Sequence, residues 1–247
     1  MVPERDVDPA DLYHQVRLGF VARLRPLSAE QLSTRVPATP RWSVHDVLAH
    51  VVGITADLNA QRFGDGDGDA WTRTQVGARR DRSIDELATE WDEEAPTFEA
   101  GLRLFGYGFG AHYLGDLLQH VGDVETALGR PPARNDLVLA VALDFYLESL
   151  EESLVEAGIG ALAVHVADDG ESWTLGRGPV VASVRGPRYE LFRSLGGRRT
   201  RDEIAGLDWS GDSERLIGLV SRYPVPDASL HEPALASGPG SSGPTWR

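Results

Sequence analysis

Apolar residues recur every three or four positions along most of the first 157 residues, a period that is typical of amphipathic helices. Serine followed three residues later by an acidic residue, at Ser43–Asp46 and Ser83–Glu86, forms capping boxes that predict where two helices begin. Ser28 and Gln31 form a similar box before a short helix. Long helices are expected over residues 9–25, 44–62, 84–104, 111–128 and 137–157.

The pattern changes after Gly158 to short alternating segments of the kind found in strands. Asp168-Asp169-Gly170 between two such segments is a strong hairpin signal. The sequence therefore predicts a mainly α protein, with a helical bundle over residues 1–157, a small α+β domain over 158–226 and a disordered tail over 227–247. Strands are expected over 162–166, 172–175 and 179–185, and helices over 189–195 and 212–220.

Three residues form a candidate metal site. His50 lies beside the apolar stripe of the 44–62 helix, and Asp116 and His120, four residues apart, lie on one face of the 111–128 helix. Two imidazoles and one carboxylate are an open ligand set of the kind used by catalytic zinc. His112 is a candidate fourth ligand or a hydrogen-bond partner of a ligand. The residues alone leave two alternatives open: a core histidine at position 50, and a hydrogen-bonded pair of Asp116 and His120 at a helix surface.

These motifs resemble a known family. The run from Pro40 to Gly53 resembles the opening motif of mycothiol-dependent maleylpyruvate isomerase-like proteins, which belong to the DinB-like metalloenzyme superfamily. The run from Asp116 to Pro131 is similar to the second metal-binding helix of that family. The stretches 71–80, 189–199 and 207–209 are similar to an actinobacterial branch, so the resemblance extends to about Pro224.

The resemblance implies an N-terminal DinB-like four-helix bundle that carries a divalent metal, usually zinc, followed by a small α+β domain. Carried over, the metal ligands are His50, Asp116 and His120. The family pattern has glutamate where Asp116 stands, and the shorter aspartate reaches less far. The resemblance also implies mycothiol as the thiol cofactor.

Composition limits the classes of partner. The chain has 24 basic and 38 acidic residues and a net charge of −14, which disfavours nucleic acid and anionic membranes as partners. Cysteine is absent, so any thiol chemistry needs an external thiol. No apolar run approaches the roughly 20 residues that a membrane span requires, and no signal peptide is visible, so the protein is expected to be soluble and cytoplasmic.

Three polar or glycine-rich segments have uncertain roles. The acidic segment 63–71 lacks the glycine and glutamate of a calcium loop and is interpreted as a flexible loop that could cover the metal end of the bundle. The glycine-rich run 105–110 lacks the lysine of a phosphate loop and is expected to break the helix. Arg198, Arg199 and Arg201 form a basic cluster that could meet an anionic substrate or remain solvated.

Two hypotheses about function follow. The first is a metal-dependent isomerase or S-transferase that uses a low-molecular-weight thiol of the mycothiol type on a small electrophilic substrate. The second is a metal-free small-molecule-binding or scaffold protein on the same bundle, which Asp116 in place of glutamate favours. The sequence leaves open which electrophile, which metal and which oligomeric state apply.

Overall fold

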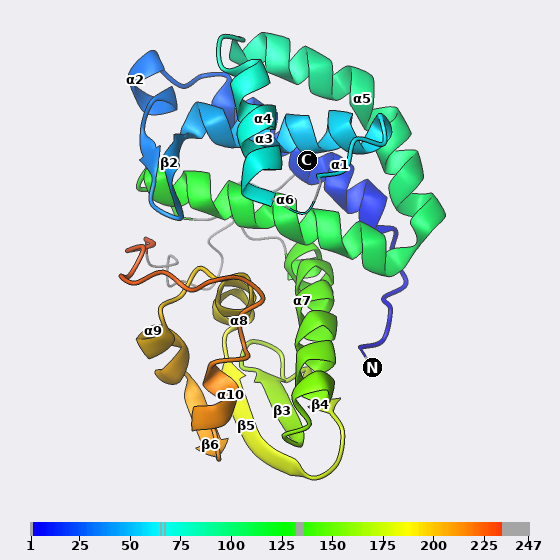
Figure 1. The fold of residues 1–247 in the computed structure, drawn as a ribbon, viewed down its shortest axis with the longest axis vertical. Helices are drawn as coiled ribbons and strands as arrows, with labels where there is room; N and C mark the ends of the chain where they lie inside the picture. Colours follow the sequence, from blue (N-terminus) through cyan, green and yellow to red (C-terminus); the bar gives the residue numbers. More distant parts are fainter. Residues whose placement is uncertain (1, 65, 67, 132–135, 234–247) are drawn as a thin grey trace. The chain divides into compact units, whose positions relative to one another are not determined.

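The computed structural model describes residues 2–64, 66, 68–131 and 136–233. These residues fold as two compact units, and each is described by itself (Figure 1). One unit comprises residues 8–131, and the other comprises residues 136–231 together with residues 2–7. No helix in the described part of the chain is both long enough and apolar enough to cross a membrane.

The first unit is built on four long helices that pack against one another (Figure 1). Their apolar faces form a continuous core that includes the fully buried side chains of Phe20, Leu48, Trp91 and Leu114, one from each helix. The predicted four-helix bundle is therefore confirmed. The helices are α1 (Pro9–Leu24), α3 (Val44–Asn59), α5 (Ile84–Phe105) and α6 (Tyr107–Ala127).

Capping boxes set the start of two bundle helices, as predicted. The Ser43 hydroxyl accepts a hydrogen bond from the Asp46 amide at 3.2 Å, and the Asp46 carboxylate accepts one from the Ser43 amide at 2.8 Å. Ser83 and Glu86 make the same pair of bonds at the start of α5, and the bonds from Ser83 lower the pKa of Glu86. Because α3 starts at Val44, His50 lies nearly two turns into the helix.

The first unit also contains elements that the sequence did not predict. A hairpin of β1 (Arg35–Val36) and β2 (Thr39–Ser43) lies between the short helix α2 (Ala29–Leu32) and α3. A further helix, α4 (Gly68–Arg79), contains Trp71, which the sequence placed in a flexible loop. Residues 65 and 67 of that predicted loop lie outside the described residues.

The predicted break at the glycine-rich run 105–110 is much shorter in the structure. The chain leaves helical geometry at Gly106, whose φ of +90° suits glycine, and α6 begins at the next residue. Gly110 lies inside α6, where an added Cβ would come within 2.8 Å of the Pro9 Cβ. The glycine therefore allows α6 to pack closely against α1, and this contact outweighs the low helix propensity of glycine.

The second unit combines α7 (Asp136–Ala157) with a sheet in the order β4–β3–β5–β6. β3 pairs with β4 in the predicted antiparallel hairpin, β3 and β5 are parallel, and β6 is antiparallel to β5. The bounds are β3 (Ala161–Val166), β4 (Ser172–Gly176), β5 (Val180–Gly186), β6 (Asp208–Gly211), α8 (Arg188–Leu195), α9 (Arg201–Ala205) and α10 (Glu214–Ile217). The predicted mainly α fold with a small α+β part is therefore confirmed.

The predicted boundary at residue 157 assigns α7 to the bundle, whereas the structure groups α7 with the sheet. In the second unit α7 packs against α8 and β4. Apolar residues on more than one face of α7 are buried, among them Val141, Leu147 and Leu154. The predicted tail falls mostly on residues 234–247, which lie outside the described residues.

Candidate metal centre

The structure brings the three predicted ligands together. His50 comes from α3, and Asp116 and His120 come from α6. Each residue offers one ligand atom, and these atoms lie within 4.8 Å of one another. His50 and His120 are only 4% and 5% exposed, whereas Asp116 is half-buried. Within the described residues His112 does not join this group, because its ring stacks on Tyr113 with 4.7 Å between centroids.

The distances suit a small divalent cation. His120 Nε2 and Asp116 Oδ1 are 3.8 Å apart. Tetrahedral zinc bonds of about 2.1 Å would place two ligand atoms roughly 3.4 Å apart, so this pair needs to close by only a few tenths of an ångström. Asp116 comes this close to His120 because the two residues lie one helical turn apart on the same face. Two imidazole nitrogens and one carboxylate oxygen within 4.8 Å of one another are a donor set of the kind that zinc or a similar divalent ion takes.

A buried hydrogen bond determines which nitrogen of His50 carries the proton. The Nδ1 atom lies 2.9 Å from Gln75 Oε1. The orientation of the Gln75 amide is defined because its Nε2 donates to Asp57 Oδ2 at 3.0 Å, and a carboxylate only accepts. The Gln75 oxygen must then accept from the Nδ1–H group of His50. His50 Nε2 therefore carries the lone pair that a metal requires.

The corresponding atom of His120 faces a carboxylate. His120 Nδ1 lies 3.6 Å from Asp123 Oδ2, and this buried atom has no hydrogen-bond partner among the described residues. A small rotation of the ring would bring the two atoms into hydrogen-bonding distance, which is the usual arrangement behind a metal-bound histidine. Both histidines thus have an acceptor on the Nδ1 side.

Gln75 and Asp57 also belong to this site, although no pattern in the sequence singled them out. Both side chains are buried, at 1% and 9% exposed. The sequence offered only an indirect indication of Gln75. This residue lies in the family-like stretch 71–80, and Gly53, which it approaches, is the last residue of the first family-like motif. An added Cβ on Gly53 would lie 2.6 Å from the Cβ of Gln75, so glycine there allows Gln75 to approach α3.

Trp42 from β2 packs against both histidines. Its ring centroid lies 4.7 Å from that of His50 and 6.3 Å from that of His120. The two imidazoles meet edge to face, with centroids 5.1 Å apart. The indole therefore shields the imidazole rings.

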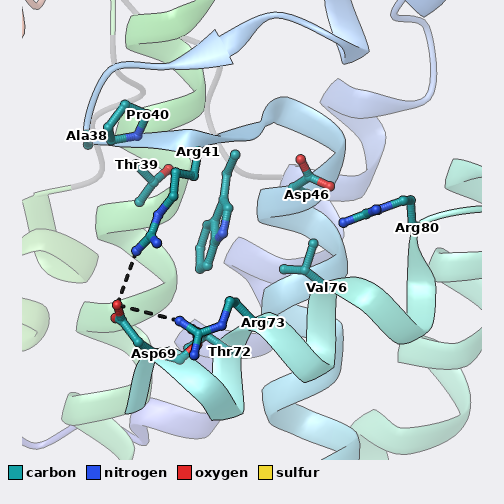
Figure 2. A pocket seen from close by; sticks show the side chains of 11 residues that line it. Ala38, Thr39, Pro40, Arg41, Asp46, Asp69, Thr72, Arg73, Val76 and Arg80 are labelled. Atoms are coloured by element: carbon teal, nitrogen blue, oxygen red, sulfur yellow. Dashed lines mark hydrogen bonds and ion pairs between the residues drawn. The ribbon is translucent and has the colours of Figure 1, made fainter. Parts of the chain in front are cut away.

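Trp42 also lines a cavity of about 530 Å³ between the β1–β2 hairpin and α4. Arg41, Arg73 and Arg80 line the same cavity (Figure 2). Arg41 and Arg73 approach Asp69 at 3.1 Å and 3.8 Å, whereas no dashed line joins Arg80 to another of the residues drawn in Figure 2. Asp46 and Asp69 line the cavity as well, so three arginines and two aspartates leave an excess of one positive charge in a chain whose net charge is −14.

The other basic cluster, Arg198, Arg199 and Arg201, is engaged within the second unit. Arg199 pairs with Glu190 at 2.7 Å, and Arg201 pairs with Glu214 at 2.6 Å. Arg198 donates to the carbonyl of Gly196 at 2.6 Å. These arginines make local contacts that stabilise the turn after α8 and the start of α9.

Comparisons with known proteins show what part of the first unit is similar to. A comparison with curated proteins gives no match. A solved structure of the mycothiol-dependent maleylpyruvate isomerase is 14% identical, with a TM-score of 0.49, and the alignment covers 83% of this chain and 94% of that one. A histidine-to-alanine variant of it is 13% identical, with the same TM-score and coverage. Residues 13–107 match the family model of the mycothiol maleylpyruvate isomerase N-terminal domain, a range that includes His50 and Gln75 and ends before Asp116. This match confirms the resemblance expected from the motifs: over residues 13–107 the chain is similar to the mycothiol maleylpyruvate isomerase N-terminal domain.

Proposed function

We propose that this protein is a metal-dependent isomerase or S-transferase that uses a low-molecular-weight thiol of the mycothiol type. The observation that carries the proposal is the convergence of His50, Asp116 and His120, whose ligand atoms lie within 4.8 Å. These residues would hold the metal, and zinc is the first candidate for an open set of two nitrogens and one oxygen. When bound, such an ion lowers the pKa of a coordinated thiol and holds it as the thiolate.

The chain supplies the environment for this chemistry but no thiol of its own. It contains no cysteine, so the thiol must come from a separate molecule. Trp42 packs over the two imidazoles and lines the neighbouring cavity, where it would exclude water from the reacting atoms. Attack of the external thiolate on an electrophilic carbon would then take place next to Trp42.

The cavity favours an electrophile that carries a carboxylate. A guanidinium group binds a carboxylate through two parallel hydrogen bonds, and Arg80 lines this cavity, whereas Arg41 and Arg73 approach Asp69 there. The name of the matched family includes mycothiol and maleylpyruvate, so these are the first thiol and electrophile to assay. Other small anionic electrophiles follow in the same assay.

Metal analysis of the purified protein tests the ligand set. Protein prepared without an affinity metal or chelator should contain close to one equivalent of zinc, and His50→Ala, Asp116→Ala and His120→Ala should each lose it. His112→Ala removes a histidine of α6 outside the ligand group and is the matched control, with zinc content unchanged. Zinc retained by the ligand variants would contradict the assignment.

An activity assay tests the cavity. Turnover of an anionic electrophile should require both zinc and the added thiol. Arg80→Met should raise KM roughly tenfold or more, because a charged hydrogen bond contributes about 1.5–3 kcal/mol, without lowering the zinc content. Arg25→Met, which removes an exposed arginine paired with Asp85, should leave KM unchanged.

The alternative function, metal-free binding of a small molecule, rests on the same cavity beside Trp42. It predicts that an anionic ligand raises the melting temperature equally with and without a chelator. A wild-type protein that takes up no zinc and shows this behaviour would favour the alternative.

A further inference from the structure

A chain of buried hydrogen bonds runs from His50 through Gln75 to Asp57. Asp57 Oδ2 accepts from Gln75 Nε2 at 3.0 Å and also from Trp71 Nε1 at 2.9 Å. Asp57 Oδ1 accepts from Arg62 Nε at 3.0 Å. The carboxylate is therefore held by three donors, and it holds the Gln75 amide in one of its two possible orientations.

We propose that Gln75, oriented by Asp57, is a positioning residue that sets the tautomer and the ring orientation of His50. The Gln75 oxygen accepts the Nδ1 proton of His50 at 2.9 Å, so the lone pair stays on Nε2. A reversed amide would present an N–H group to Nδ1 and would move the ring proton to Nε2, the nitrogen a metal needs unprotonated. The importance of this role for metal binding rests on the proposed function.

Because these hydrogen bonds are buried, water cannot easily take the place of either partner. Gln75 is 1% exposed and His50 is 4% exposed, so water has little access to either end of their hydrogen bond. A buried polar group that loses its partner costs about 1–3 kcal/mol, which favours the single arrangement in which all groups are satisfied. The orientation of Gln75 is therefore transmitted to the imidazole.

Helix α4 positions Gln75 next to His50. Trp71 and Gln75 are one turn apart on the same face of α4, and both donate to Asp57 of α3. Arg79, one turn further on, pairs with Glu90 of α5 at 2.5 Å. Contacts from successive turns of α4 therefore hold it against α3 and α5. The middle turn contains Gln75, whose amide is hydrogen-bonded to His50.

The first experiment requires no metal. Histidine labelled with ¹⁵N in the metal-free protein reports the tautomer through two-bond ¹H–¹⁵N couplings, and the His50 signal is identified by its loss in His50→Ala. We expect the Nδ1–H tautomer in the wild type and a shift toward the Nε2–H tautomer in Gln75→Leu. An Nε2–H tautomer in the wild type, or an unchanged tautomer in the variant, would overturn the proposal.

The second experiment measures zinc affinity by competition with a chromogenic chelator. Gln75→Leu and Asp57→Leu should weaken zinc binding by about 10- to 100-fold, as is typical when the hydrogen-bond partner of a ligand is lost. Asp57→Asn should stay close to the wild type, because its amide oxygen still accepts from Gln75. Wild-type zinc affinity in Asp57→Leu, or a loss in Asp57→Asn as large as that in Asp57→Leu, would contradict the proposed orientation.

Thr55→Val is the matched control. Thr55 is a buried polar residue of α3 whose hydroxyl accepts a hydrogen bond from Trp91 Nε1 at 3.1 Å and donates to the carbonyl of Val51 at 3.1 Å. It should lower the melting temperature and leave zinc affinity unchanged. Equal loss of zinc affinity in Thr55→Val and Gln75→Leu would show a merely structural effect and overturn the proposal. A tautomer that responds as expected in a protein that binds no zinc would support the positioning role and contradict the metal-dependent function.

Discussion

Replacing Gly53 by alanine tests how closely α4 must approach α3 for Gln75 to reach His50. A Cβ on Gly53 would lie 2.6 Å from the Gln75 Cβ and 2.9 Å from its Cγ, both close to the backbone of α4. Ordinary contact begins near 3.4 Å, so this part of α4 must retreat by about 0.8 Å. The His50–Gln75 hydrogen bond, now 2.9 Å, would lengthen by up to about 0.8 Å and weaken.

The expected energies follow from two opposing effects. Overpacking a buried contact costs about 1–3 kcal/mol, whereas alanine in place of glycine inside a helix gains about 1 kcal/mol. The net loss of up to about 2 kcal/mol should lower the melting temperature by up to roughly 8 °C. Zinc affinity should fall about tenfold, because the hydrogen bond that orients His50 is weakened.

Gly77→Ala is the control for this substitution. Gly77 lies on α4, and an added Cβ there would meet nothing within 4 Å. The control should gain about 0.5–1 kcal/mol and leave zinc affinity unchanged. Thermal unfolding followed by circular dichroism and zinc competition measure both variants. A Gly53→Ala protein as stable as Gly77→Ala, with wild-type zinc affinity, would refute the close-packing argument.

Three further predictions concern stability, each measured by thermal or denaturant unfolding. Arg23→Met should cost about 3–5 kcal/mol, because Arg23 donates at 2.8 Å to the buried Glu125, and Glu125→Gln in the same chain should recover much of that loss. Burial, followed by repulsion from Asp144, raises the pKa of Glu148, so its stabilising effect is present below the ordinary value of 4.5 and is lost as pH rises through the raised pKa. Glu148→Gln should therefore stabilise the protein by about 0.5 kcal/mol or less at pH 7 and leave it unchanged below pH 4.5; an equal gain at both pH values would contradict this account. Chelation should lower the melting temperature of the wild type and leave that of His50→Ala unchanged, and an equal shift in both would contradict a stabilising metal at His50.

Local signals in the chain were sufficient for the bundle. The apolar stripes of α1, α3, α5 and α6 and the boxes at Ser43 and Ser83 are properties of residues within one or two turns of each other. The spacing of Asp116 and His120 is equally local, because residues four apart share a helix face. The bundle helices, their starting points and the pairing of Asp116 with His120 could therefore be predicted from the sequence alone.

Helix α4 lacked such a signal. Among its residues only Gln75, Val76 and Arg79 are buried, so the face that packs inward is mostly polar and leaves no apolar stripe. Polar residues at those positions are stable in the interior only because Asp57 and Glu90, from other helices, provide partners. This helix therefore depends on contacts that the sequence pattern does not reveal.

The sequence by itself determined the helical bundle, the small α+β unit and the three candidate ligands, because periodicity, capping and helix spacing act over a few residues. Only the tertiary structure decided that Gln75 meets His50, that Gly53 must be small, and that α7 belongs with the sheet. These features depend on contacts between segments far apart in the chain, and such contacts are set by how whole helices pack.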